Sequence, residues 1–283
     1  MNHKPGITSM QNPLVKQVLR LQQKAAERKK TGLFVVEGRR EVSLALTHGV
    51  NLHQLLLCPE VFTEDPAYPV LTMAAGDRKT VYVSRAVYNR MAYRGDAEGV
   101  LMLGEHKSRD PLQLTLPDSP LIVVLEAVEK PGNLGAVLRT ADAAGVDAVV
   151  LADARTDLYN PNVIRSSLGC VFTLPVVSCS SSEAIAWLTN AGSWPGEKQP
   201  RIYAAALQTD TLYYDSDMRG PSALVFGAED KGLSAPWQAA AHQTIKIPMS
   251  GSIDSLNIGA SVAVLCFEAR RQRQQQANPR AKS

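Results

Sequence analysis

The chain has 283 residues, of which 45% are hydrophobic and 20% are charged, as in an ordinary soluble globular protein. No apolar run reaches the roughly 18 residues that a membrane-spanning helix needs, and the start of the chain lacks the apolar core of a secretory signal. We therefore expect a cytoplasmic protein without a membrane partner. The length predicts two domains, because one hydrophobic core serves about 100–200 residues.

The net charge of +3 is too small to indicate a polyanionic partner by itself, but basic residues gather near both ends of the chain. One group lies between Lys16 and Lys30, and the other lies between Arg270 and Lys282. Both groups are suited to binding phosphates. Solvated helix faces and a soluble disordered tail explain them equally well.

The cysteines have no metal-ligand spacing, and each lies in or beside an apolar stretch. We expect buried free thiols, no metal site and a reducing compartment. The residues are Cys58, Cys170, Cys179 and Cys266.

The first 106 residues alternate between helix and strand patterns. Asn12 and Pro13 predict a helix start, because asparagine caps helices and proline suits the first helical position, and Gly32 predicts its end. Ser84 predicts the cap of a later helix that ends near Met91. A further helix is expected after the first strand and ends near residue 49. Strands are expected at residues 33–37, 52–58, 81–83 and 99–103, which together predict a sheet with helices on its faces.

A polar segment with three prolines, residues 106–120, predicts a domain boundary. Beyond it, continuous apolar runs predict strands that are buried on both faces, at residues 121–125, 148–151, 171–177, 202–207, 223–226 and 244–247. The helices expected between them include residues 133–144, one opened by Asn160-Pro161 and one with the capping-box spacing Ser180-x-x-Glu183, and a last helix starts near residue 254.

The predicted fold class is α/β. The predicted domains are residues 1–106 and 121–271, joined by a linker at 107–120 and followed by a polar tail at 272–283 that we expect to be disordered.

Three glycine-bearing loops in the C-terminal half each follow an apolar run, which is where open α/β sheets bind ligands. They are Lys130–Thr140 (KPGNLGAVLRT), Leu224–Ser234 (LVFGAEDKGLS) and Ile247–Gly259 (IPMSGSIDSLNIG). Each loop alone is also compatible with an ordinary turn or helix cap. None contains G-x-G-x-x-G or G-x-x-x-x-G-K-[ST], which argues against nicotinamide and ATP chemistry.

Together the loops resemble the three signature motifs of the SpoU/TrmH family of RNA 2′-O-ribose methyltransferases, over about residues 121–268. The matching residues are Asn133, Gly135 and Arg139, then Gly227, Glu229 and Gly232, then Ser255, Leu256 and Asn257. The sequence departs from the usual pattern at Ala228, where asparagine is common, at Asp230, where glycine is common, and at Gly259, where serine is frequent. We expect these departures to affect the position of the RNA substrate in the site more than the methyl-transfer reaction itself.

The resemblance implies a SPOUT α/β domain with a deep trefoil knot that binds S-adenosyl-L-methionine, in a homodimer with each site near the subunit interface. It implies these cofactor-binding residues: Leu207, Gly227, Glu229, Gly232, Ile247, Pro248, Met249, Ser255, Leu256 and Asn257. It implies these catalytic residues: Arg139, Glu229, Asn257, Ser255 and Asn133.

The segments Thr8–Gln17 and Gly32–Gly38 are similar to the L30e-like substrate-binding domain that precedes the catalytic domain in many family members. That resemblance implies a structured RNA partner. The candidate RNA-binding residues are Lys24, Arg28, Lys29, Lys30, Arg39, Arg40, Arg94 and Arg139.

S-adenosyl-L-methionine carries an activated methyl group, so the expected reaction needs no metal. Arginine stays protonated near neutral pH, so we expect Arg139 to bind a phosphate and to stabilise developing alkoxide charge rather than to act as a base. In this hypothesis Glu229 orients Arg139, and Ser255 and Asn257 donate or accept hydrogen bonds at the cofactor or ribose. The proton leaves to a phosphate oxygen or to water.

The leading hypothesis is therefore a methyltransferase that acts on ribosomal RNA, with transfer RNA as the second choice. One alternative is a non-catalytic RNA-binding or ribosome-assembly factor that retains the fold. Another is a nucleotide-dependent oxidoreductase, against which the missing glycine fingerprint argues.

Overall fold

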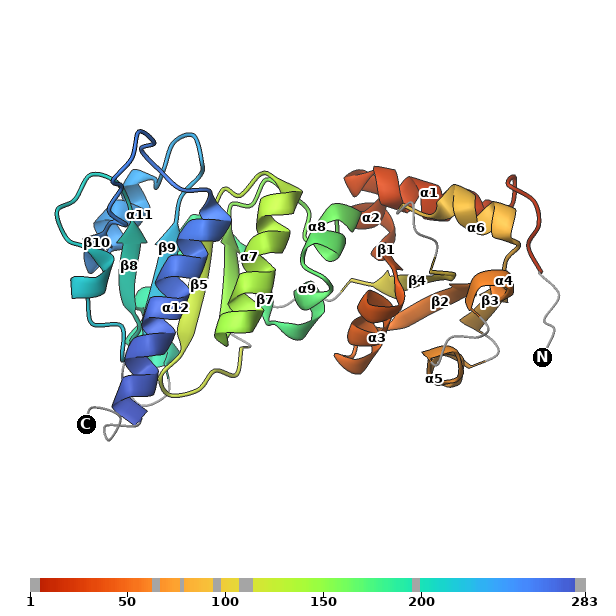
Figure 1. Ribbon diagram of the computed structural model, residues 1–283, viewed down its shortest axis with the longest axis horizontal. Coiled ribbons are helices and arrows are strands. Elements are labelled where there is room, and N and C mark those ends of the chain that lie inside the picture. Colours follow the sequence, from red (N-terminus) through yellow and green to blue (C-terminus); the bar gives the residue numbers. More distant parts are fainter. Residues whose placement is uncertain are drawn as a thin grey trace. The chain divides into compact units, whose positions relative to one another are not determined.

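The computed structural model describes residues 6–62, 67–76, 79–93, 98–106, 114–194 and 199–277. The chain forms two compact units, which Figure 1 colours along the sequence. The first contains Met1–Lys107 and Asp157–Thr173, and the second contains Ser108–Thr156 and Leu174–Ser283. The segment Asp157–Thr173 thus packs with the amino-terminal unit, whereas the predicted domain of residues 121–271 was continuous and included it.

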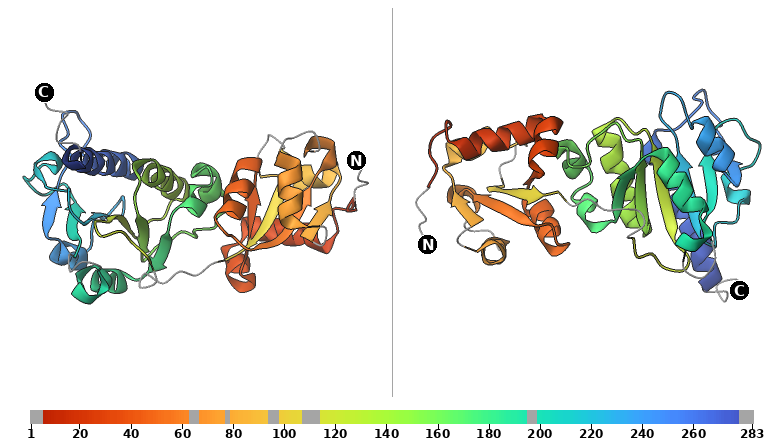
Figure 2. Two further views of the ribbon diagram at one scale, coloured as in Figure 1. Left: turned by 90° about the horizontal axis from the view of Figure 1, so that it is seen from below. Right: turned by 180° about the vertical axis from the view of Figure 1, so that it is seen from behind.

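The first unit is built on a four-stranded mixed sheet in the order β1 (Leu33–Glu37), β4 (Val100–Glu105), β2 (Leu52–Leu57) and β3 (Thr80–Tyr82). Strand β4 runs antiparallel to both of its neighbours, and β2 pairs with β3 in parallel. Helices α1 (Pro13–Gln23) and α6 (Arg85–Met91) cover one face, and α3 (Arg39–Thr47) and α5 (Ala67–Ala75) lie on the other (Figures 1 and 2). Short helices α2 (Ala25–Thr31) and α4 (Pro59–Phe62) complete this unit's amino-terminal part.

The predicted helix signals of this unit are confirmed. The Asn12 side chain accepts the Leu14 N–H at 2.9 Å, and the Ser84 hydroxyl accepts the Val87 N–H at 3.4 Å. Gly32 ends α2 with a φ of +67°, a left-handed conformation that costs glycine little. One detail differs, because an extended residue, Lys24, divides the expected single helix into α1 and α2.

The segment Asp157–Thr173 forms helices α8 (Pro161–Ser166) and α9 (Cys170–Thr173). Tyr159 stacks on Phe34 of β1 with 4.1 Å between ring centroids, and Phe172 lies 6.0 Å from the same ring. The predicted strand at 171–177 is therefore wrong in its first half, since β7 begins only at Val176. A short apolar run does not distinguish a helix from a strand, and here the contact with β1 supplies the burial that the prediction assigned to a sheet.

The second unit is built on a six-stranded sheet in which every pair of neighbours is parallel. Its order is β10 (Gln243–Ile245), β8 (Arg201–Ala205), β9 (Ser222–Phe226), β5 (Leu121–Glu126), β6 (Ala148–Ala152) and β7 (Val176–Cys179). Helices α7 (Pro131–Ala144) and α12 (Ile258–Ala277) lie side by side on one face, and α10 (Ser181–Thr189) and α11 (Ala235–Ala240) cover the other (Figure 2). The α/β prediction is confirmed.

Local sequence signals also set the helix ends of this unit. Gly145 closes α7 with a φ of +65°, and Ser180 and Glu183 form the predicted capping box of α10. Helix α12 begins at Ile258 rather than near residue 254, and the Asn257 side chain accepts the Gly259 N–H at 2.9 Å. Short 3₁₀ turns lie at Ala191–Ser193 and Tyr213–Asp215.

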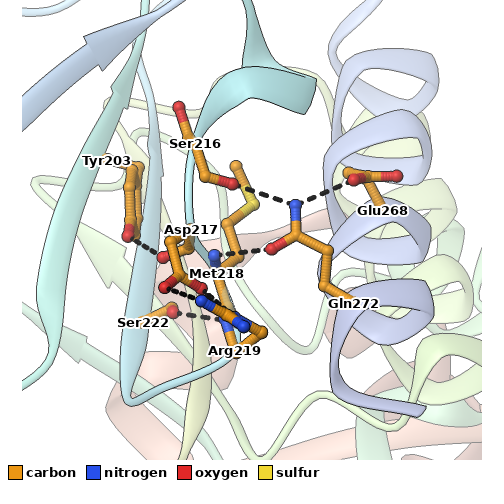
Figure 3. A network of polar contacts seen from close by, with 8 residues as sticks. All are labelled: Tyr203, Ser216, Asp217, Met218, Arg219, Ser222, Glu268 and Gln272. Carbon is orange, nitrogen blue, oxygen red and sulfur yellow. Dashed lines mark hydrogen bonds and ion pairs between the residues drawn. The ribbon is translucent and has the colours of Figure 1, made fainter. Parts of the chain in front are cut away.

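The predicted disordered tail is wrong for residues 272–277, which belong to α12, while residues 278–283 lie outside the described residues. Gln272 donates to the Ser216 carbonyl at 2.9 Å and accepts the Met218 N–H at 2.8 Å, as Figure 3 shows. Arg273 donates to the carbonyls of Ser119, Pro120, Met218 and Gly220 over 2.7–3.1 Å. These side chains fasten the end of α12 to the segments that precede β5 and β9.

Within the described ranges, no helix is long and apolar enough to cross a membrane.

Candidate active site

The three motif loops meet at the carboxyl edge of the parallel sheet in the second unit. The first loop follows β5, the second follows β9 and the third follows β10. Because all strands of this sheet run in one direction, the segments that follow them leave from the same edge. The third loop then leads into α12, which packs beside α7, the helix that the first loop opens.

The second loop is closed on itself. The Ala228 N–H donates to the Gly232 carbonyl at 3.1 Å, and the Gly232 N–H donates back to the Ala228 carbonyl at 2.8 Å. Gly232 has a φ of +66°, and a Cβ atom on Gly227 would lie only 2.1 Å from the Gly232 carbonyl carbon. Both motif glycines are therefore required, one for its conformation and one for the close approach of two backbone segments.

A chain of side-chain hydrogen bonds joins all three motifs. The Glu229 carboxylate accepts from Lys130 Nζ with one oxygen and from Asn133 Nδ2 with the other. Asn133 Oδ1 in turn accepts from Asn257 Nδ2 at 3.3 Å. Glu229 thus lies over the first turn of α7, where the helix dipole also favours a negative charge.

Lys130 is a site residue that was not among the predicted ones. It is the cap residue of α7, its side chain is 69% exposed, and it pairs with Glu229. The hydrogen bond from Lys130 to Glu229, together with the charge of that carboxylate, raises the pKa of the lysine above its ordinary value. Its place directly before Pro131 was visible in the sequence, but its partner lies 99 residues further along the chain.

Arg139 lies exposed on α7, and it forms no ion pair or hydrogen bond through its side chain with any residue that the structure describes. The hypothesis that Glu229 orients Arg139 is therefore replaced, because Glu229 binds Lys130 and Asn133 instead. The Arg139 guanidinium is left available for a ligand.

The remaining predicted cofactor residues lie along the same edge. Leu207 and Ile247 each follow their strand by two residues, and those paired strands end opposite each other at Ala205 and Ile245. Leu207 is 47% exposed, while Ile247, Met249 and Leu256 are half-buried, and Pro248 and Ser255 are exposed. The edge therefore combines accessible apolar side chains with a tight glycine loop. This combination fits a group with a flat heterocycle and a polar chain, such as S-adenosyl-L-methionine.

The predicted RNA-binding residues of the first unit divide into two groups. Lys24, Lys29, Lys30 and Arg40 are exposed, and Arg39 is exposed although its guanidinium pairs with Glu98 at 3.5 Å. Arg94 lies outside the described residues.

Arg28, in contrast, is only 2% exposed, so its assignment to RNA binding is corrected. Its guanidinium binds Asp157 and donates to the Leu21 carbonyl, each at 2.5 Å. A buried guanidinium needs such partners, and Arg28 therefore fastens the Asp157–Thr173 segment to the helices of the first unit.

No group of three or more histidine, cysteine, aspartate or glutamate side chains among the described residues is placed to hold a metal ion. The cysteines are free thiols, as predicted. Cys58, Cys170 and Cys266 are buried and Cys179 is half-buried.

Known protein families match both parts of this chain. The SpoU rRNA Methylase family matches residues 120–267, and the MRM3-like substrate binding domain matches residues 12–102. An uncharacterized tRNA/rRNA methyltransferase of Synechocystis is 31% identical over 97% of this chain and 96% of its own length. The 23S rRNA (guanosine-2′-O-)-methyltransferase RlmB of Pectobacterium atrosepticum is 36% identical over 58% of this chain and 64% of its own length.

A solved structure has a similar fold over most of the chain. The SpoU methyltransferase AviRb from Streptomyces viridochromogenes, in complex with the cofactor AdoMet, superposes with a TM-score of 0.83 at 28% identity, covering 93% of this chain and 100% of its own. The sequence matches, the architecture and the convergence of the three motif loops lead to one conclusion: the chain belongs to the SpoU rRNA methylase family.

Proposed function

We propose that this chain is an enzyme that transfers a methyl group from S-adenosyl-L-methionine to a ribose 2′-hydroxyl of ribosomal RNA. The observation that carries the proposal is the hydrogen-bonded chain from Glu229 through Asn133 to Asn257, which joins the three family motifs at one edge of the sheet. Relatives that are named as 23S rRNA 2′-O-methyltransferases and a neighbouring structure with bound AdoMet support the same reaction.

When bound, S-adenosyl-L-methionine supplies an electrophilic methyl group on a sulfonium, so the chain's own residues have only to hold and align the reactants. The backbone hydrogen bonds between Ala228 and Gly232 hold the second loop in the closed shape that we expect to face the cofactor's polar atoms. Leu207, Ile247 and Leu256 offer apolar surface for its heterocycle.

Arg139 acts on the RNA side of the site. Its guanidinium stays charged near neutral pH, so it binds the phosphate next to the target ribose and stabilises negative charge that develops on the 2′-oxygen. It does not remove the proton, which leaves to a phosphate oxygen or to water. The Glu229 network fixes the relative positions of the loops and so the geometry of the reaction.

A homodimer, a deep trefoil knot and a cytoplasmic location remain predictions. The exposed Phe267 ring on α12 supports the homodimer, because α12 packs beside α7 and a second copy would cover this apolar side chain. Analytical ultracentrifugation of the wild type and of Phe267→Asp tests it, with a shift of the mass from two copies towards one as the expected result.

The decisive experiment combines binding and transfer. Calorimetry with S-adenosyl-L-methionine is expected to show binding, and ribose-methylation mapping of unmodified 23S rRNA incubated with the enzyme is expected to show one new site. Asn133→Ala breaks the link between Glu229 and Asn257 and should lower transfer, while Asn190→Ala, far from the motifs in sequence, serves as the matched control. If the wild type bound RNA but did not bind the cofactor and methylated no ribose, the chain would be the non-catalytic RNA-binding factor instead.

A further inference from the structure

Two helices on one face of the first unit present a group of cations to solvent. Lys16 and Arg20 lie about one turn apart on α1, and Lys24 is the cap residue at its C-terminal end. Arg85 and Arg90 lie on α6, which packs against α1 on the same side of the sheet (Figures 1 and 2). All five residues are exposed, and we call them the basic face.

The direction of these cations follows from the residues that each helix buries. The buried positions follow the helical repeat, so each helix turns an apolar stripe to the sheet. Lys16 and Arg20 lie opposite the stripe of α1, while Arg85 and Arg90 flank the stripe of α6. The two helices therefore expose their cations over adjoining outer surfaces. The stripes consist of Val15, Val18 and Leu21 on α1 and of Val87, Tyr88 and Met91 on α6.

Few carboxylates compensate the basic face. Arg20 pairs with Glu27 at 3.5 Å, but half of the Arg20 side chain stays exposed. The Glu60 carboxylate accepts the Arg85 N–H at 3.1 Å, at the start of α6. Apart from Arg20, no member of the basic face forms an ion pair within the described ranges. Five cations thus stand against two carboxylates, an excess as large as the net charge of +3 of the whole chain.

The opposite face of the same unit lacks this charge. Helix α5 contains no charged residue, and its Val70 and Met73 are exposed apolar side chains. On α3, Arg39 is paired with Glu98, which leaves Arg40 as the exposed cation of that helix without an ion pair in the described part of the chain. An anionic partner is therefore favoured on the side of α1 and α6.

The basic face lacks the feature that proteins use to bind single-stranded RNA. Unpaired bases stack on exposed aromatic rings. Neither α1 nor α6 exposes such a ring, because α1 has no aromatic residue and Tyr88 of α6 is fully buried. The exposed neutral side chains of Gln23 and Asn89 can donate hydrogen bonds to phosphate or ribose oxygens. Cations and amides without a ring fit the backbone of an RNA double helix, which proteins contact at its phosphates and 2′-hydroxyls.

We propose that the basic face binds the phosphate backbone of a double-helical segment of the RNA substrate. The proposal rests on the proposed function and deepens it, because it names the form of RNA that the first unit binds. Contacts to phosphates carry no sequence information, so this face supplies affinity and orientation. The target nucleotide is selected by other contacts.

The experiment measures binding of the full-length chain to a short RNA duplex and to one of its strands alone, over a range of salt concentrations. The wild type is expected to bind the duplex more tightly than the single strand. The variant that combines Lys16→Gln and Arg90→Gln removes one cation from each helix. Its affinity for the duplex should fall by roughly tenfold to a hundredfold at about 0.1 M salt, and its salt dependence should be shallower by about two ions.

The matched control combines Arg201→Gln and Arg219→Gln. These residues are exposed near the starts of β8 and β9 in the second unit, so the control loses the same net charge and keeps the basic face. Its affinity for the duplex is expected to stay within about twofold of the wild type. Urea unfolding checks that both variants fold, and glutamine is a good helix former. If the combined variant does not fold, Lys16→Gln and Arg90→Gln are measured singly, each with a salt dependence shallower by about one ion.

Calorimetry with S-adenosyl-L-methionine separates this proposal from the proposed function. Normal cofactor binding with weakened duplex binding in the Lys16 and Arg90 variant supports the basic face. A wild type that bound no cofactor would reject the methyltransferase, whereas the duplex measurements would still decide the role of the basic face. The proposal would be overturned if this variant bound the duplex as tightly as the control. It would also be overturned if the wild type bound the single strand at least as tightly as the duplex.

Discussion

Substitution of Gly227 by alanine tests whether the closed second loop forms the cofactor site. The new Cβ would lie 2.1 Å from the Gly232 carbonyl carbon and 2.3 Å from both the Gly232 oxygen and the Leu233 nitrogen. All three are backbone atoms, so no side-chain rotation relieves the clash. The two arms of the loop have to move apart.

The size of the effect follows from the distances. Real Cβ atoms stay at least 3.0 Å from such neighbours, so the arms must separate by about 0.9 Å, the difference from 2.1 Å. The same movement would lengthen the 2.8 Å bond between the Gly232 N–H and the Ala228 carbonyl beyond hydrogen-bonding distance. The loss of two backbone hydrogen bonds corresponds to about 1–3 kcal/mol of stability. If the closed loop forms part of the cofactor site, opening it should lower the affinity for the cofactor by roughly tenfold to a hundredfold.

The assay is calorimetric titration with S-adenosyl-L-methionine, together with urea unfolding of the same variant. Gly220→Ala is the matched control, because a Cβ there meets no heavy atom within 4 Å and the backbone needs no positive φ. If Gly227→Ala bound the cofactor and unfolded like Gly220→Ala, the closed loop would not be the binding element.

Three further predictions concern charge and burial. Arg139→Ala and Arg139→Lys should both slow single-turnover methyl transfer while leaving cofactor binding intact, and wild-type rates in both would remove this residue from the mechanism. Lys130→Gln should weaken RNA binding at low salt, because it removes an exposed cation at the site. The hydrogen bond from Asn133 to Glu229 stays in place in this variant. An RNA affinity with the same salt dependence as the wild type would contradict this role for Lys130. Burial raises the pKa of the Cys266 thiol to about 12, so the native state favours the neutral thiol and loses this stabilisation as the pH rises from about 9 towards 12. A thiol reagent at pH 8 should therefore label half-buried Cys179 first, and rapid labelling of Cys266 in the native protein would contradict its burial.

Interactions between neighbours in the chain were predictable. The Asn12 cap, the capping box that starts at Ser180 and the left-handed Gly145 each depend on residues within a few positions of one another, and each is found in the structure. The apolar runs likewise identified the central parallel strands β5 and β6, because a strand covered on both faces needs apolar side chains at successive positions, but the run at residues 171–177 proved to be part helix.

Interactions between distant residues were not predictable in the same way. Lys130 finds its partner 99 residues away, and Arg28 finds Asp157 129 residues away. Arg273 reads as part of a basic tail, but its guanidinium donates to carbonyls more than 50 residues earlier. A charged residue has the same appearance in a sequence whether it is solvated or buried with a partner, so its role depends on the packing.

Composition, periodicity and caps by themselves determined the α/β class and the positions of most helices and strands, and the three motifs by their resemblance pointed to the family. Only the tertiary structure decided that Asp157–Thr173 packs with the amino-terminal unit and that Glu229 binds Lys130 and Asn133 instead of Arg139. The physical reason is the distance along the chain over which each kind of interaction acts. Local signals act through a few bonds along the backbone, whereas burial and ion pairing depend on which distant segments the fold brings together.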